Sequence, residues 1–240
     1  MFVVLSVIAV FSVFTVKNVD VSFNVSDELK YETNEIQDKL DKYLGKNLMF
    51  VDTEEISTIL NDYPYLEVLS LKKSWPNVIK VELTERQKVY YVSNSDNGEK
   101  YILDVNGVVV EKVNTVPNGL IELKTEIKSV ELNSKIVLQD DYQEFLSLSL
   151  SVILNDFFTN TVKAVEICPA SAEQAESVIY LEMSTGLKIE IYKANERGND
   201  KLSFALEYYD KSLSDREKYV HSFIVFEENG QIKAGYTEYN

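Results

Sequence analysis

Residues 19 to 83 change their hydrophobic period twice, and this change constrains the fold of the chain more than any other feature. At residues 19–25 apolar side chains occupy every second position, which predicts a half-buried strand. Two segments with helical spacing follow, and residues 66–71 and 78–83 then alternate again around a turn at residues 73–77. The sequence therefore predicts the order strand, helix, helix, strand, strand.

Capping residues delimit the two predicted helices. Asn34 is expected to cap the first helix, which Gly45 ends. Asp52, with Glu55 three residues later, is expected to cap the second, and Pro64 prevents its continuation. The positions expected to face the core are Ile36, Leu40, Tyr43 and Leu44 in the first helix and Ile56, Ile59, Leu60 and Tyr63 in the second.

The sequence from Val89 onward predicts a second, mostly antiparallel β domain. Asn-Gly pairs at 106–107 and 229–230 are typical of tight hairpin turns. Helical spacing predicts two helices in this region, at residues 140–157 and 201–209. The expected fold class is α+β, with the β-α-α-β-β domain at residues 18–88 and the β domain at residues 89–240.

An uncharged, mostly apolar run extends from Phe2 to Val16. As a helix it would measure about 22 Å, against roughly 30 Å for the hydrocarbon core of a bilayer. A cleaved signal peptide is the alternative, but no basic residue precedes the run and Lys17–Asp20 offers no small-residue cleavage site. We therefore expect an uncleaved transmembrane anchor at residues 1–17.

Composition argues against several classes of function. The formal net charge of -15 opposes binding to nucleic acid. A single cysteine, Cys168, and a single histidine, His221, cannot build a disulfide, a zinc cluster or a histidine-based metal site. Paired carboxylates stay possible among 39 acidic residues, but no substrate-binding signature accompanies them. We expect no catalytic residues, cofactor, metal or small-molecule substrate. The rival hypothesis is a wall-modifying enzyme that uses a pair of carboxylates.

Two motifs give the first domain a specific resemblance. Lys72–Arg86 contains a basic pair, Trp-Pro-Asn, an alternating strand and a closing Glu-Arg, and Gly45–Leu48 is followed by Val51-Asp52. Together with the apolar run before the first strand, they resemble the POTRA module of the bacterial FtsQ/DivIB cell-division family. The later region is similar more loosely, through Leu103–Val108 and the helix that begins at Lys201. The family's usual Gly-Asn after the first strand is replaced by an insertion around residues 26–31.

The resemblance implies a single-pass membrane protein with its C-terminal domains outside the cytoplasm at the division septum. It implies a divisome scaffold that binds FtsB/DivIC-like and FtsL-like proteins and helps control septal peptidoglycan synthesis. A POTRA-bearing secretion or transport factor is the alternative.

The candidate partner site is the last predicted strand, Gln231–Tyr236. A strand near a chain terminus is often the edge of a sheet, where it can accept a partner strand. By position, the resemblance maps partner contacts to Phe226, Ile232, Ala234 and Tyr236. The same alternate side chains could instead face the core, and both interpretations stay open.

Trp75 has two possible roles in the turn. Pro76 fixes its own backbone angle and favours an extended Trp75, so the turn is stiff. We expect the indole to pack over one end of the helix pair, with a contact to a partner protein as the alternative.

Overall fold

The computed structural model of the protein describes residues 13–24, 30–95, 97–153, 161–172, 174–220 and 222–236. The chain divides into two compact units, Met1–Arg86 and Gln87–Asn240. The predictions for residues 1–12 of the anchor, for the end of the 140–157 helix and for His221 concern positions outside the described residues. In the described part of the chain, no helix is both long and apolar enough to cross a membrane.

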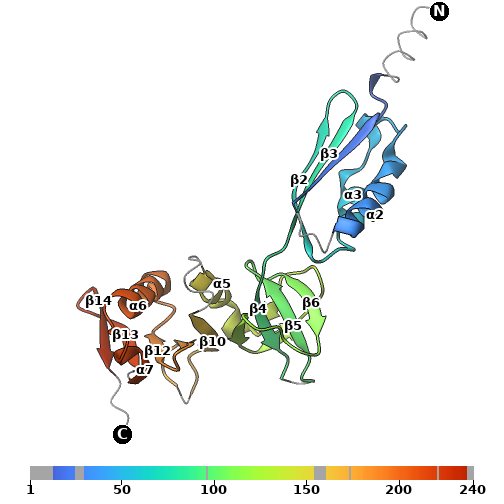
Figure 1. Ribbon diagram of the computed structural model, residues 1–240. Helices are drawn as coiled ribbons and strands as arrows, with labels where there is room; N and C mark the ends of the chain where they lie inside the picture. The colour runs from blue at the N-terminus through green and yellow to red at the C-terminus, as the bar shows by residue number, and fades with distance from the viewer. Residues whose placement is uncertain are drawn as a thin grey trace, which may run out of the picture. The chain divides into compact units, whose positions relative to one another are not determined.

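The first unit is a three-stranded sheet with helices on one face (Figure 1). The strand order is β1-β3-β2, with β1 parallel and β2 antiparallel to the central β3. The elements are β1 (Asn18–Asn24), α2 (Lys30–Leu40), η2 (Asp41–Tyr43), η3 (Leu48–Phe50), α3 (Thr53–Leu60), β2 (Leu66–Ser74) and β3 (Val78–Glu85). The predicted order of strands and helices is confirmed.

Apolar side chains from the sheet and both helices form one core in this unit. The alternating residues of β3, Ile79, Val81 and Leu83, are almost fully buried against the helices. Burial of each such side chain stabilises the fold by about 1.5–3 kcal/mol. The predicted core positions Ile36, Leu40, Tyr43, Ile56, Leu60 and Tyr63 are buried, and Ile59 packs against them.

Leu44 is an exception among the predicted core positions, because 43% of its surface is exposed. The 3₁₀ turn η2 ends at Tyr43, and Leu44 has an extended backbone with ψ of 137°. The side chain therefore leaves the buried face of the helix.

One of the two predicted helix caps is correct. The Asp52 carboxylate accepts a hydrogen bond from the Glu54 amide at 2.8 Å, as an N-cap does. Glu55 does not complete a capping box, since it pairs with Lys42 at 2.8 Å. The Asn34 cap is wrong, because α2 begins at Lys30 and places Asn34 inside the helix.

The second unit is built on a nine-stranded sheet of order β14-β13-β12-β11-β10-β7-β4-β5-β6. Its strands are β4 (Lys88–Ser93), β5 (Lys100–Asp104), β6 (Val109–Val113), β7 (Ile121–Lys124), β10 (Val162–Cys168), β11 (Val178–Met183), β12 (Lys188–Tyr192), β13 (Phe223–Glu228) and β14 (Gln231–Tyr236). A small separate sheet pairs β8 (Ile127–Ser129) with β9 (Val137–Leu138). The pairs β4·β7, β7·β10 and β12·β13 are parallel and the others antiparallel, so antiparallel pairing predominates without being uniform.

The helices of the second unit differ from the two that were predicted. The stretch from residue 140 is split into α4 (Asp140–Gln143), α5 (Leu146–Leu150) and η4 (Ser151–Ile153). The Ser151 hydroxyl donates to the Leu148 carbonyl at 2.6 Å, where α5 gives way to η4. The second predicted helix is α6 (Gly198–Lys211), and the short α7 (Glu217–Val220) was not predicted.

The first Asn-Gly turn is organised by a buried carboxylate. Asp104 is 1% exposed, and its Oδ1 accepts hydrogen bonds from the amides of Asn106 and Val108, both at 2.8 Å. Gly107 has φ of +78°, a left-handed conformation that glycine adopts without strain. The hairpin between β5 and β6 therefore depends on Asp104 as well as on the Asn-Gly pair.

Replacing Asp104 with alanine is expected to destabilise the protein by about 1–3 kcal/mol, because the amides of Asn106 and Val108 lose a charged acceptor. Asp104→Asn keeps an acceptor oxygen and should cost clearly less. Urea unfolding of both variants measures the difference. Equal losses for the two variants would contradict a role in accepting hydrogen bonds.

Candidate functional site

The strand β14 is one edge of the nine-stranded sheet, as the sequence predicted. It pairs with β13 along its whole length, from Glu228↔Gln231 to Phe223↔Tyr236. Among the described strands, β13 is its single neighbour. The backbone groups on the outer edge of β14 are therefore available to a strand from another protein.

The hairpin that presents β14 has a tight turn at Asn229-Gly230. Both residues have positive φ, 52° and 76°, which matches the twist of the flanking strands. Lys233 and Glu228 form an ion pair across the hairpin at 2.6 Å. The second predicted Asn-Gly turn is thus confirmed, and it fixes the register of the edge strand.

The four predicted contact residues do not lie on one face of the hairpin. Ile232 and Ala234 pack against the core of the unit. Phe226 pairs with Lys233 and alternates with the buried Val225, so its side chain lies on the opposite face. Tyr236 is 52% exposed, and a hydrogen bond with Tyr208 raises the pKa of its hydroxyl to about 12.

Phe226 lines a cavity of about 510 Å³ beside the hairpin. The cavity combines an apolar wall with charged groups at the ends of β12 and β13. Its lining residues are Tyr192, Lys193, Glu196, Lys201, Ile224, Phe226, Glu227, Asn229 and Gly230. The cavity is large enough to take a side chain of a protein that binds along β14.

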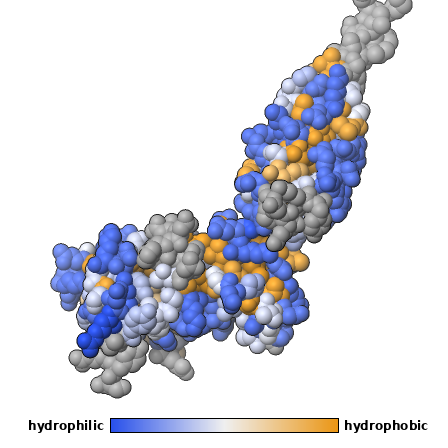
Figure 2. All heavy atoms as spheres, in the orientation of Figure 1, coloured by the Kyte–Doolittle hydropathy of each residue, from blue (hydrophilic) through white to orange (hydrophobic). Residues whose placement is uncertain are grey.

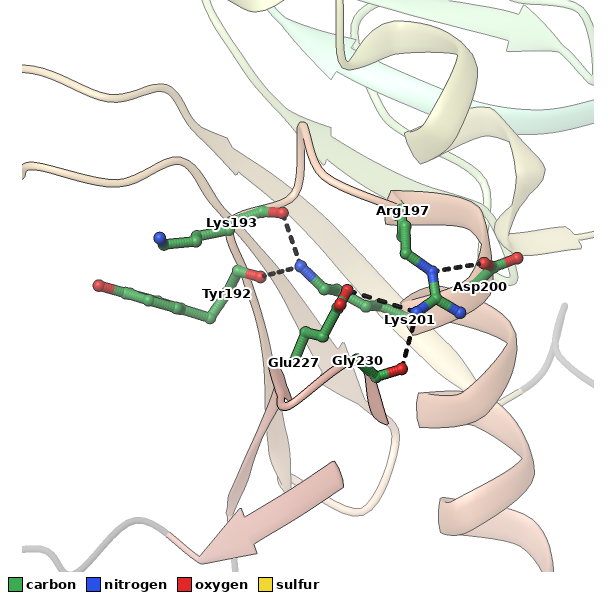
Figure 3. Close-up of polar contacts among 7 residues, drawn as sticks. All are labelled: Tyr192, Lys193, Arg197, Asp200, Lys201, Glu227 and Gly230. Atoms are coloured by element: carbon green, nitrogen blue, oxygen red, sulfur yellow. Dashed lines mark hydrogen bonds and ion pairs between the residues drawn. The ribbon is translucent and has the colours of Figure 1, made fainter. Parts of the chain in front are cut away.

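Lys201 is a buried cation in the first turns of α6, with an exposure of 1%. Its Nζ donates hydrogen bonds to the carbonyl oxygens of Tyr192 at 3.0 Å and Lys193 at 2.9 Å (Figure 3). Burial lowers the pKa of its ammonium group. These bonds hold α6 against the end of β12, next to the cavity.

Arg197 connects the start of α6 to the hairpin. Its Nε donates to Asp200 at 3.0 Å, and its Nη1 lies 3.4 Å from both the Glu227 carboxylate and the Gly230 carbonyl (Figure 3). These contacts are partly exposed, so each contributes modestly. Arg197 therefore contacts the turn that leads into β14, while Lys201 contacts the end of β12.

Neither basic residue was recognised as part of the site from the sequence. A signal for Lys201 was present, because Lys201, Ala205 and Tyr209 follow one another at a spacing of four residues and all three are buried. A lysine on the buried stripe of a helix indicates a fixed partner for its ammonium group. No comparable signal exists for Arg197, whose partners lie in a distant hairpin.

In the described ranges, no group of three or more His, Cys, Asp or Glu side chains could hold a metal ion. Cys168 lies partly buried at the end of β10, and burial raises the pKa of its thiol. The arrangement around β14 offers backbone hydrogen bonds, an apolar wall and fixed charges. These features are suited to binding an extended segment of a protein.

Comparison with known proteins places the first unit in a defined group. Residues 15–86 match the family model described as "POTRA domain, FtsQ-type". The chain is 26% identical over 125 residues to the cell division protein DivIB of Clostridium acetobutylicum, covering 51% of this chain and 48% of that protein. It is 24% identical over 146 residues to the DivIB of Clostridium botulinum, covering 60% of this chain and 52% of that protein. The chain thus spans about half the length of these relatives.

A solved structure is also similar in part. It is the major extracytoplasmic domain of the trans isomer of the cell division protein DivIB from Geobacillus stearothermophilus, with a TM-score of 0.32 and 16% sequence identity. The match covers 54% of this chain and 98% of that one.

Replacing Lys201 with methionine is expected to destabilise the second unit by about 1–3 kcal/mol, because the carbonyls at the end of β12 lose a charged donor. Lys211→Met is the matched control, since Lys211 is in the last turn of the same helix and exposed. The control should change stability by less than about 0.5 kcal/mol. Urea unfolding measures both, and equal effects would contradict the role of Lys201.

The effect of Lys201→Met should also depend on pH. Burial lowers the pKa of the Lys201 ammonium group in the folded protein, so the unfolded chain binds the ammonium proton more tightly. The contribution of Lys201 to stability therefore increases as the pH rises toward the pKa of an unfolded lysine, about 10.4. The loss caused by the substitution should therefore be larger near pH 10 than near pH 7. A loss that shrinks with rising pH would contradict this sign.

Proposed function

We propose that the chain is a member of the FtsQ/DivIB family of bacterial cell-division proteins, and that it is a division scaffold that acts by binding partner proteins and not by catalysis. The FtsQ-type POTRA domain at residues 15–86 supports the family's role in cell division. The edge strand β14 is the observation that carries the binding function, because it offers an unfilled position in the sheet.

The proposed partners are an FtsB/DivIC-like and an FtsL-like division protein. A segment of the partner adds a strand to β14, and its backbone groups pair with the outer edge of the sheet. One partner side chain enters the cavity lined by Phe226 and Tyr192, whose rings provide apolar contact. Tyr236, half exposed near the end of β14, provides a further contact at the edge.

In this proposal Ile232 and Ala234 act indirectly. Both pack against the core of the second unit, so their side chains hold β14 in place while its backbone contacts the partner. Phe226 and Tyr236 are the two of the four predicted residues that can touch a partner with their side chains.

The proposed location is the bacterial cell membrane at the division septum. The apolar run at the start of the chain acts as a single-pass anchor, but the predicted boundary at residue 17 is too late, because Val16 is buried in the core of the first unit. The domains predicted at residues 18–88 and 89–240 lie outside the cytoplasm. There the complex with its partners helps control septal peptidoglycan synthesis. The uncharged, apolar character of the run from Phe2 to Val16 supports anchorage in the membrane.

A pair of proline substitutions in β14 tests binding through the edge strand. Successive residues of an antiparallel edge strand direct their N–H groups alternately toward the neighbouring strand and outward. Of Lys233→Pro and Ala234→Pro, one therefore removes a bond to β13 and the other removes an outward donor. The variant that keeps its thermal stability should bind the FtsB/DivIC-like and FtsL-like pair about tenfold more weakly.

Binding is measured with the full chain against the paired partners of the same cell. Lys233→Ala is the control, since it removes the ion pair with Glu228 and keeps the backbone donor. Undiminished binding by a stably folded proline variant would rule out the edge strand. If the unmodified chain fails to bind the pair, the partner assignment is wrong and the alternative of a secretion or transport factor gains support.

A further inference from the structure

Backbone hydrogen bonds join three segments at one end of the first unit, the end where residue 13 lies. The Leu48 amide donates to the Phe14 carbonyl at 2.7 Å, and the Val16 amide donates to the Lys46 carbonyl at 2.8 Å. The Lys17 amide donates to the Asn77 carbonyl at 2.9 Å. Residues 13–17, 44–50 and 72–77 therefore form one surface, here called the entry end, with the β2–β3 turn beside the start of β1 (Figure 1).

Large apolar side chains are exposed at the entry end. Phe14 contacts the Trp75 ring edge to face, with 5.3 Å between the ring centroids. The exposed members of the surface are Val13 (50%), Leu44 (43%), Met49 (53%), Phe50 (75%) and Trp75 (56%). Figure 2 shows hydrophobic residues at this end of the unit. An exposed apolar surface of this kind marks an interaction site.

Trp75 thus departs from the packing role that the sequence predicted. Its indole does not cover the end of the helix pair but lies on Phe14, more than half exposed. The buried side chains near the helix ends are instead those of Leu48 and Tyr43.

The charge of the entry end is opposite to that of the whole chain. Its three segments contain four lysines, Lys17, Lys46, Lys72 and Lys73, and no acidic residue, in a chain with net charge -15. Lys46 Nζ lies 4.5 Å from the centroid of the Tyr43 ring, and Lys73 Nζ donates to the Met49 carbonyl at 3.3 Å. The apolar side chains are therefore bordered by ammonium groups.

We propose that the entry end is a membrane-contact surface, which docks the first unit on a bilayer containing anionic lipids. Aromatic side chains such as Trp75 favour the interface between water and lipid, and lysines favour the surface of anionic lipids. The uncharged run from Phe2 leads directly into the entry end, which puts this surface next to the bilayer. The inference rests on the proposed membrane anchorage and adds to it a defined orientation of the domain.

A protein partner would satisfy the apolar surface but explains less. A lipid surface accounts for the exposed rings, the bordering lysines and the adjacent apolar run together, because all three are features of segments at a membrane interface. The composition of the entry end therefore favours lipid.

Trp75 is the single tryptophan of the chain, so its fluorescence reports on the entry end alone. The test uses the full chain reconstituted into phosphatidylcholine vesicles with and without phosphatidylglycerol, each containing lipids with a quencher near the headgroup. We expect quenching of Trp75 in the vesicles with phosphatidylglycerol, and protection from acrylamide in the aqueous phase. Vesicles of phosphatidylcholine alone should quench less.

Lys17→Gln and Lys46→Gln test the electrostatic part. Each substitution should lower the ratio of docked to undocked domain about fivefold, which corresponds to roughly 1 kcal/mol per basic residue near an anionic surface. Lys135→Gln and Lys211→Gln, at exposed lysines of the second unit, are the matched controls and should leave quenching unchanged.

The outcomes separate this inference from the proposed function. A chain that does not float with vesicles of either composition would overturn both the anchorage and the docking. An inserted chain whose Trp75 quenching is the same with and without phosphatidylglycerol, and unchanged by the lysine variants, would overturn the docking alone. Protection of Trp75 only after addition of the division partners would assign the surface to a protein.

Discussion

The hydrogen bonds of the buried Lys201 ammonium group hold the helix that packs against the edge strand β14. The ammonium group joins the first turns of α6 to the end of β12 through two carbonyl oxygens, and α6 in turn packs against β12, β13 and β14. A buried charge is costly unless it is fully hydrogen-bonded, so the geometry at this point permits little variation. The hairpin that carries the edge strand is consequently held from one side by α6 and from the other by β12.

The two units use different means to present their surfaces. In the first unit a compact core leaves its apolar and basic residues at one end, where the chain enters. In the second unit β14 is the edge strand of the sheet among the described residues, so the proposed interaction surface is the outer backbone edge of β14. The proposed binding of a membrane by one unit and of a partner strand by the other requires no catalytic group in either.

Local signals were sufficient for much of the first unit and for both Asn-Gly turns. The Asp52 cap and the alternation in β3 each involve residues only a few positions apart, so both can be recognised from the sequence alone. The Asn34 cap failed because α2 continues upstream of the predicted start. The single helix expected from residue 140 is wrong, since the described stretch is divided into α4, α5 and η4.

The sequence by itself determined the order of elements in the POTRA domain, the two hairpin turns and a strand at residues 231–236 near the sheet edge. Tertiary structure decided which faces these elements present: Phe226 and Ile232 fall on opposite sides of one hairpin, and Trp75 lies outside the core. The physical reason is the range of the interactions. Periodicity and turns depend on neighbours in sequence, whereas the burial of Lys201, the packing of Ile232 against the core and the exposure of Trp75 depend on segments brought together only by folding.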